Sequence, residues 1–158
     1  MPSAPSVTLS LPDLTATQAL GRRIARLLRP GDAVLLEGPL GAGKSELARA
    51  LLRAAARDPA LEVPSPSFTL VQSYETPAGL VHHYDLWRLE RARDVLELDW
   101  DGARDDIVLV EWPDRLGPLR PEHGLTVVLA IGHGEERIAT LAGWPDRIGH
   151  LAGTDSLT

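Results

Sequence analysis

Short apolar runs alternate along the chain with longer stretches in which apolar residues repeat at helical spacing. Residues 33–36 and 107–110 are continuously apolar, which predicts strands covered on both faces. Residues 126–131 and 137–141 predict two later strands around a Gly-His-Gly turn, and residues 7–11 predict an edge strand. These runs together predict a central sheet.

A hairpin is predicted near the middle of the chain. Alternate residues from Phe68 to Tyr74 share one strand face, residues 76–79 form a turn, and residues 80–84 return as a second strand. The prolines of the preceding Pro64-Ser-Pro segment force extended backbone, so this hairpin is expected to be separated from the helix before it.

Helices are predicted on either side of the first apolar run. Residues 47–55 repeat apolar side chains at helical spacing, with arginines on the opposite side. Residues 20–28 also repeat apolar side chains at helical spacing. The preceding Thr15-Ala-Thr-Gln18 predicts a capping box at the start of this helix, and Pro30 predicts its end. A short helix is expected over residues 90–98. The sum is an α/β layered domain with a mixed, mainly parallel central sheet.

Length and composition bound the class of protein. With 158 residues, the sequence predicts a single domain over 1–158, with residues 1–6 and about 145–158 as mobile tails. It has no cysteine, so disulfides and thiol-based metal sites or nucleophiles are excluded. It lacks an apolar run of transmembrane length and a signal segment, from which we expect a cytoplasmic protein. The net charge of −6 argues against strong direct nucleic-acid binding by the isolated chain.

The chain has one lysine among its 16 basic residues, and it lies in the most informative motif. Gly38-Pro-Leu-Gly-Ala-Gly-Lys44-Ser45 matches G-x-x-x-x-G-K-[ST], the P-loop, between a predicted strand and a predicted helix. Its glycines let backbone N–H groups turn onto phosphate oxygens, and the helix N-terminus adds a positive dipole end. A compact ammonium fits between phosphates where a planar guanidinium does not. The motif predicts a nucleotide-binding, P-loop NTPase-like three-layer domain, with a site formed by Gly38, Leu40, Gly41, Ala42, Gly43, Lys44, Ser45 and Glu46.

Two acidic residues follow predicted strands. Glu111 comes directly after an apolar run and Asp85 ends another strand, and α/β ligand sites form at such carboxyl ends. With the Ser45 hydroxyl, they would satisfy the oxygen preference of Mg²⁺. Alternatives stay open: Glu111 could be a solvated strand-end acid, and Asp85 could pair with Arg88 or cap a turn.

Four blocks carry a resemblance to a known family. They are Gly38-Pro-Leu-Gly-Ala-Gly-Lys-Ser45, Ser65-Pro-Ser-Phe-Thr-Leu-Val71, His83-Tyr-Asp-Leu-Trp-Arg-Leu89 and Val110-Glu-Trp-Pro113. In this order they resemble the TsaE (YjeE) family, the bacterial ATPases of tRNA threonylcarbamoyladenosine biosynthesis. The chain departs from the usual family pattern at Ser45, Glu46 and Ser67, where threonine is common, and at Trp87, where tyrosine is common. Ser45 keeps the hydroxyl of the residue after the lysine.

The resemblance implies specific roles. It implies ATP and Mg²⁺ as cofactors, Ser45 and Glu111 as metal ligands, and Asp85 as essential for hydrolysis. Residues around Thr15 and Thr17 are implied to approach the nucleotide. The implied partner is the TsaD–TsaB complex, which transfers the threonylcarbamoyl group to the adenosine beside the tRNA anticodon. Residues 65–74 are the natural candidate for the surface that responds to the nucleotide.

Three other functions remain to be weighed against this one. A small-molecule or nucleoside kinase shares the P-loop and the size, and Arg115 and Arg120 after Glu111 could belong to its lid. A GTP-dependent switch protein is the least favoured of the three, because an Asn-Lys-x-Asp guanine motif would need a second lysine. A nucleotide-binding module without catalysis would hydrolyse no ATP even with its partners.

Overall fold

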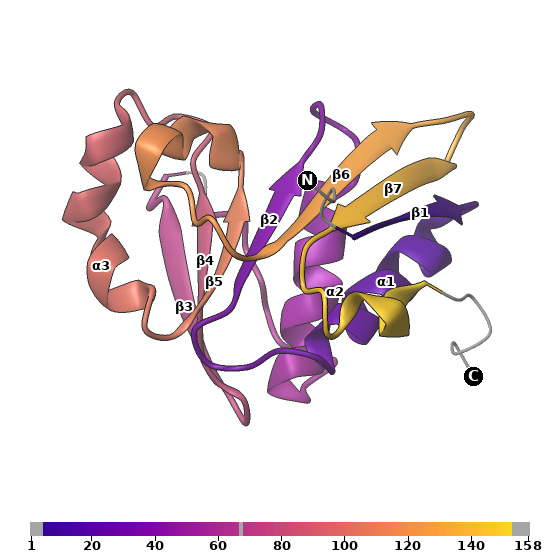
Figure 1. Cartoon of the computed structure of the whole chain (residues 1–158), viewed down its shortest axis with the longest axis horizontal. Coiled ribbons are helices and arrows are strands. Elements are labelled where there is room, and N and C mark those ends of the chain that lie inside the picture. The colour runs from indigo at the N-terminus through magenta and orange to yellow at the C-terminus, as the bar shows by residue number, and fades with distance from the viewer. Residues whose placement is uncertain (1–4, 67, 153–158) are drawn as a thin grey trace.

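The computed structural model describes residues 5–66 and 68–152 of the chain. Within these residues, seven strands form one sheet in the order β1-β7-β6-β2-β5-β4-β3 (Figure 1). The four central strands β6, β2, β5 and β4 run parallel. Strands β7 and β3 pair antiparallel with β6 and β4, and β1 pairs antiparallel with β7. This arrangement confirms the predicted α/β fold with a mixed sheet. The strands are β1 (Ser6–Leu11), β2 (Ala33–Glu37), β3 (Val71–Thr76), β4 (Gly79–Asp85), β5 (Ile107–Glu111), β6 (Leu125–Ile131) and β7 (Arg137–Ala142).

Helices cover both faces of the sheet. The long helices α1 (Leu14–Ala25) and α2 (Lys44–Ala56) pack on one face. Three short elements cover the β2-β5-β4 part of the other face: η1 (Ala92–Leu98), α3 (Trp100–Ala103) and η2 (Pro113–Leu119). Figure 1 shows this three-layer arrangement, with α1 and α2 on the side away from α3. None of the helices in the described part of the chain is long and apolar enough to cross a membrane.

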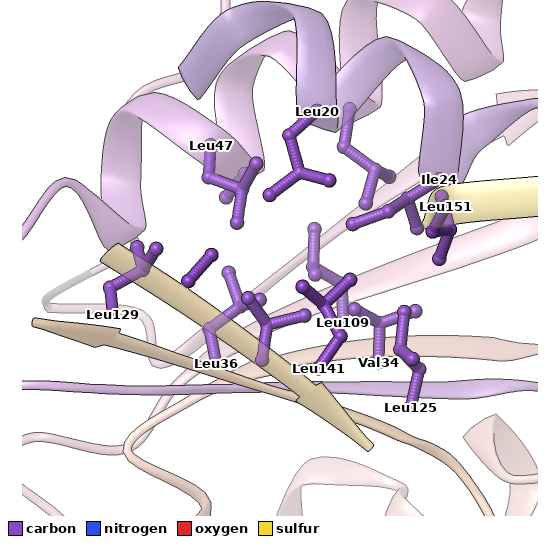
Figure 2. Close-up of a cluster of buried hydrophobic side chains, with 14 of the residues drawn as sticks. Leu20, Ile24, Val34, Leu36, Leu47, Leu109, Leu125, Leu129, Leu141 and Leu151 are labelled. Atoms are coloured by element: carbon purple, nitrogen blue, oxygen red, sulfur yellow. The ribbon is translucent and has the colours of Figure 1, made fainter. Parts of the chain in front are cut away.

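Strand β2 explains why its sequence is continuously apolar. Val34 and Leu36 point into the cluster beneath α1 and α2, whereas Ala33 and Leu35 point into the cluster on the other face. All four are almost fully buried, and burying a valine or leucine side chain contributes roughly 1.5–3 kcal/mol relative to exposure. Figure 2 shows Val34 and Leu36 together with Leu20 and Leu47 of the two helices.

The crossing of α1 and α2 depends on a glycine. A Cβ at Gly21 would lie 2.9 Å from the backbone oxygen of Leu47, which is closer than real Cβ atoms come. Gly21 therefore lets α1 lie directly on α2, the helix that begins at the P-loop.

Helix α1 starts earlier than the sequence suggested. Its N-cap is Asp13, whose side chain accepts a hydrogen bond from the backbone N–H of Ala16 at 2.9 Å. Thr15 and Thr17 lie inside the first turns of the helix, so the predicted capping box at Thr15 is wrong. Asp and Thr both cap well, and the apolar repeat did not distinguish the two starting points.

The strand predicted from Phe68 begins only at Val71. Leu70 has a left-handed backbone (φ 68°), and its N–H bonds to the carbonyl oxygen of Pro66 at 2.6 Å. This turn takes Phe68 out of the sheet and leaves it 87% exposed.

The expectation of a mobile tail after residue 145 is wrong for residues 145–152. This segment contains η3 (Ile148–Leu151), and Ile148 and Leu151 are buried in the cluster beneath α1. Arg147 forms a bidentate ion pair with Asp32, with both N···O distances 2.8 Å. At the other end, Ser6 already belongs to β1. The rest of the two predicted tails, residues 1–4 and 153–158, lies outside the described residues.

Candidate functional site

The P-loop connects the carboxyl end of β2 to the first residue of α2. Gly38, Gly41 and Gly43 have φ values of 144°, 83° and 101°, which residues with a side chain rarely adopt. Gly43 is the N-cap of α2 and provides no side-chain hydrogen bond to the first helical N–H groups. The loop therefore presents a helix N-terminus without a side-chain cap, which is the arrangement that binds phosphate.

Lys44 is held in the centre of this loop. Only 5% of the residue is exposed, and its ammonium donates hydrogen bonds to the carbonyl oxygens of Gly38 and Pro39. The ring of Trp112 lies over the ammonium at 4.1 Å. Burial lowers the pKa of Lys44, while the negative charges of Glu111 and Asp85 act in the opposite direction. The side chain is thus folded back onto its own loop, beside two acidic residues.

The two predicted acidic residues meet at the ends of β4 and β5. These strands pair in parallel, and Asp85 is the direct register partner of Glu111. The hydroxyl of Ser45, in the first turn of α2, donates to Glu111 Oε1 at 3.1 Å. The exposed alternative for Glu111 is wrong, because the residue is 2% exposed. The fold thus brings together three residues that are far apart in the sequence.

A fourth residue, His83, was not identified as part of the site from the sequence. Its Nε2 lies 2.7 Å from Glu111 Oε2, and the two side chains are 2% and 3% exposed. His82 instead pairs with Asp106 on the opposite side of β4. The strand alternation that separates the two histidines was visible in the sequence, but the contact with Glu111 depends on the pairing of β4 with β5.

Asp85 makes the turn-capping contact of its structural interpretation. Its carboxylate accepts from the backbone N–H of Trp87 at 3.2 Å, which is a turn cap, and from the Ser65 hydroxyl at 3.4 Å. No ion pair joins it to Arg88 within the described residues; the Arg88 guanidinium lies over the Phe68 ring, 5.1 Å from its centroid. Burial, followed by the charge of Glu111, raises the pKa of Asp85.

The side chains of Lys44, Ser45, Asp85 and Glu111 line a cleft of about 390 Å³ in front of the P-loop. Its wall includes two tryptophans in contact, Trp87 and Trp112, with ring centroids 4.5 Å apart. Trp112 has a left-handed backbone (φ 62°), which for a bulky residue indicates a position held by its surroundings. The lining consists of Leu40, Gly41, Gly43, Lys44, Ser45, Glu46, Ser65, Asp85, Trp87, Glu111 and Trp112.

The remaining predicted site residues lie around this cleft at different depths. Ala42 is fully buried behind the loop, and a Cβ on Gly43 would lie 3.9 Å from Thr17. Thr15, two residues earlier in α1 than Thr17, is exposed and is not among the described residues that line the cleft. Glu46 lines the cleft, but its carboxylate pairs with Arg49 at 2.6 Å.

The side chains that could contact a metal at this site are few. Within the described residues, no cluster of three or more His, Asp or Glu side chains has the geometry of a metal site. Ser45 and Glu111 together offer oxygen ligands at one point, so a hard cation would need further oxygens from water or a ligand.

Comparisons with known proteins identify the family of the chain. Residues 11–139 match the family model described as "Threonylcarbamoyl adenosine biosynthesis protein TsaE". The tRNA threonylcarbamoyladenosine biosynthesis protein TsaE of Mycobacterium tuberculosis is 37% identical over 147 residues, covering 84% of each chain. The proteins of the same name from Rickettsia felis and Synechocystis sp. are 31% and 37% identical, over 79% and 72% of this chain and 73% and 74% of theirs.

The fold has a counterpart among solved structures. The crystal structure of Bacillus subtilis YdiB superimposes with a TM-score of 0.73 over 99% of this chain and 97% of that one. At 23% identity this likeness supports the fold. The range matched by the family model includes the P-loop and both acidic residues, and the chain belongs to the TsaE family of threonylcarbamoyladenosine biosynthesis proteins.

Proposed function

We propose that this protein is a Mg²⁺-dependent ATPase that supports the TsaD–TsaB complex in threonylcarbamoylation of the adenosine beside the tRNA anticodon. The observation that carries the proposal is the cleft in which Lys44, the uncapped N-terminus of α2 and the Ser45–Glu111 pair face one point. A phosphate chain needs an ammonium and backbone N–H donors, and a phosphate-bound cation needs hydroxyl and carboxylate oxygens.

The residues present fit ATP and Mg²⁺. The glycines of the P-loop leave space for phosphate oxygens, and the hydrogen bonds of Lys44 to loop carbonyls can be exchanged for bonds to phosphate. Ser45 and Glu111 would hold the cation, which supplies charge neutralisation to the phosphates when bound. Asp85 sits beside this pair and would orient water, either at the metal or for attack.

A partner role is supported by the rim of the cleft. Leu40 and Trp87, both at the cleft, are 65% and 40% exposed, and Phe68 beside Arg88 is 87% exposed. Exposed apolar side chains gathered around a site are typical of a protein interaction surface. Phe68 belongs to the segment 65–74 that was expected to respond to the nucleotide, and Ser65 links the same segment to Asp85.

The isolated chain is expected to hydrolyse ATP slowly. The candidate site contains no arginine with a contact to the Ser45–Glu111 pair among the described residues, and an arginine supplied by a partner can raise phosphoryl transfer by roughly 10³–10⁵. Docking of TsaD–TsaB over the rim would then complete the site. Because a nucleotide sensor works only through differential affinity, the complex should bind the ATP state more tightly than the ADP state.

The proposal is tested by two measurements. ATP turnover is compared for the protein alone and with TsaD–TsaB, and binding to TsaD–TsaB is compared with ATP, with ADP and without nucleotide. We expect partner-stimulated turnover and preferential binding with ATP. Equal partner affinity in all three states, together with unchanged turnover, would refute the proposed function.

The two arginines on which the kinase alternative depended each have a contact in the structure. Arg120 pairs with Glu37 at 2.6 Å, and the Arg115 guanidinium lies 5.9 Å from the centre of the Trp87 ring. Screening small-molecule acceptors for ADP release coupled to phosphorylation distinguishes the two activities. Cytoplasmic location and weak direct nucleic-acid binding stay predictions of the sequence.

A further inference from the structure

The carboxylate of Glu111 is held from two sides. Ser45 donates to one oxygen at 3.1 Å, and His83 Nε2 lies 2.7 Å from the other. Since a carboxylate oxygen can only accept, the hydrogen of this second bond is carried by His83 Nε2. Glu111 therefore has a fixed rotamer in which Oε1 faces α2 and Oε2 faces the interior of the sheet.

His83 is a costly residue for packing alone. Its Nδ1 is buried without a hydrogen-bond partner among the described residues, so the imidazole pays for desolvation and makes one bond, to Glu111. Two positions earlier on the same face of β4, Val81 is fully buried in the aliphatic core beneath α2. An aliphatic side chain could fill the position of His83 at lower cost, which means that packing does not account for a histidine there.

We propose that His83 is a positioning residue for Glu111, which it keeps oriented toward Ser45 and the cation of the bound nucleotide. This inference rests on the proposed Mg²⁺-dependent nucleotide binding. It predicts a distinct phenotype: without the Nε2 donor, Glu111 can rotate away from Ser45, and the affinity for the cation falls while the P-loop contacts to phosphate remain. Groups that orient a metal ligand typically contribute about 10–100-fold to metal affinity.

Two amide substitutions separate orientation from packing. His83→Gln places an amide nitrogen the same number of bonds from Cα as Nε2, so it can still donate to Glu111. His83→Asn carries the same amide one methylene short of this position. For each variant, equilibrium affinity for a fluorescent ATP analogue is measured against Mg²⁺ concentration and, separately, in EDTA. A thermal unfolding curve accompanies each variant.

The expected result is a shift in the Mg²⁺ concentration for half-maximal binding. His83→Asn should raise it by about 10–100-fold, and His83→Gln should stay within about threefold of wild type, with affinity in EDTA unchanged in both. Equal shifts in the two variants, or no shift in either, would overturn the proposal. A wild-type protein whose nucleotide affinity ignores Mg²⁺ would defeat the proposed function itself.

A metal-free measurement tests the same geometry. Long-range ¹H–¹⁵N correlation of the histidine rings in the protein without nucleotide should show the proton of His83 on Nε2, and Glu111→Gln should change that signal. A proton on Nδ1 alone would contradict the hydrogen bond on which the proposal depends. Because this readout needs neither ATP nor Mg²⁺, its outcome is independent of the proposed ATPase activity.

Discussion

Arg147 provides a sharp test of what holds the C-terminal segment to the domain. Its guanidinium makes two hydrogen bonds of 2.8 Å to Asp32 and one of 2.7 Å to the carbonyl oxygen of Leu27, and it lies 4.0 Å from the centre of the Trp144 ring. Arg147 and Asp32 are only 8% and 9% exposed. The bond to Asp32 is the main cause of the raised pKa of Arg147.

Arg147→Leu keeps most of the side-chain volume and removes the charge. It leaves the Asp32 carboxylate buried with only the backbone N–H of Arg29 as a donor. Removing one partner of a buried ion pair costs roughly 3–5 kcal/mol, so we expect the free energy of unfolding to fall by about 3 kcal/mol. The chain offers a matched control: Arg29 pairs with Asp146 at 3.2 Å, but these side chains are 61% and 65% exposed. Arg29→Gln should cost less than about 1 kcal/mol.

Urea unfolding, followed by circular dichroism, measures the free energy of unfolding of both variants. The comparison requires that the dependence of this free energy on urea concentration is the same as in wild type. The double variant Asp32→Leu/Arg147→Leu should recover part of the loss, because it no longer buries an unpaired charge. The reasoning fails if Arg147→Leu costs no more than Arg29→Gln. It also fails if the loss of stability in the double variant equals the sum of the losses measured for Asp32→Leu and Arg147→Leu separately.

The other predictions concern the cleft and one buried tyrosine. Lys44→Ala should weaken ATP affinity by about ten- to a hundredfold, and Lys44→Arg should not restore it; an arginine variant with wild-type affinity in equilibrium titration would contradict this. Glu111→Gln should chiefly raise the Mg²⁺ concentration needed for ATP binding, whereas Asp85→Asn should chiefly lower turnover while ATP still binds. Mg²⁺ titrations and steady-state turnover measure these effects, and wild-type turnover in either variant would indicate that the substituted residue has a structural role. Burial, followed by the charge of Asp99, raises the pKa of Tyr84 to about 12 from 10.0. The neutral phenol therefore contributes about 2–3 kcal/mol to the free energy of unfolding below pH 10, and this contribution is lost as the pH rises through 12. Unfolding curves at alkaline pH should show a smaller pH dependence of stability for Tyr84→Phe than for wild type, and identical pH profiles would contradict the prediction.

The elements that the sequence predicted well are those with a strong local pattern. The short continuous apolar run in β2 is typical of a strand buried on both faces, and the glycines of the P-loop permit the positive φ angles that the loop has. The start of β3 and the packing of Arg147 were missed because neither has a local signal. The first depends on a left-handed turn at Leu70, and the second on a carboxylate that lies 115 positions away.

The chemistry of the site depends on register, which a single sequence does not contain. The apolar runs showed that Asp85 and Glu111 each end a strand, but not that they are opposite each other. If β4 were shifted by one residue relative to β5, Tyr84 would stand opposite Glu111, and its side chain belongs to the other face of the sheet. His83 would then have no route to the carboxylate. The contact between His83 and Glu111 is thus a direct consequence of the parallel pairing of β4 and β5, and a measurement of that hydrogen bond tests the register together with the site.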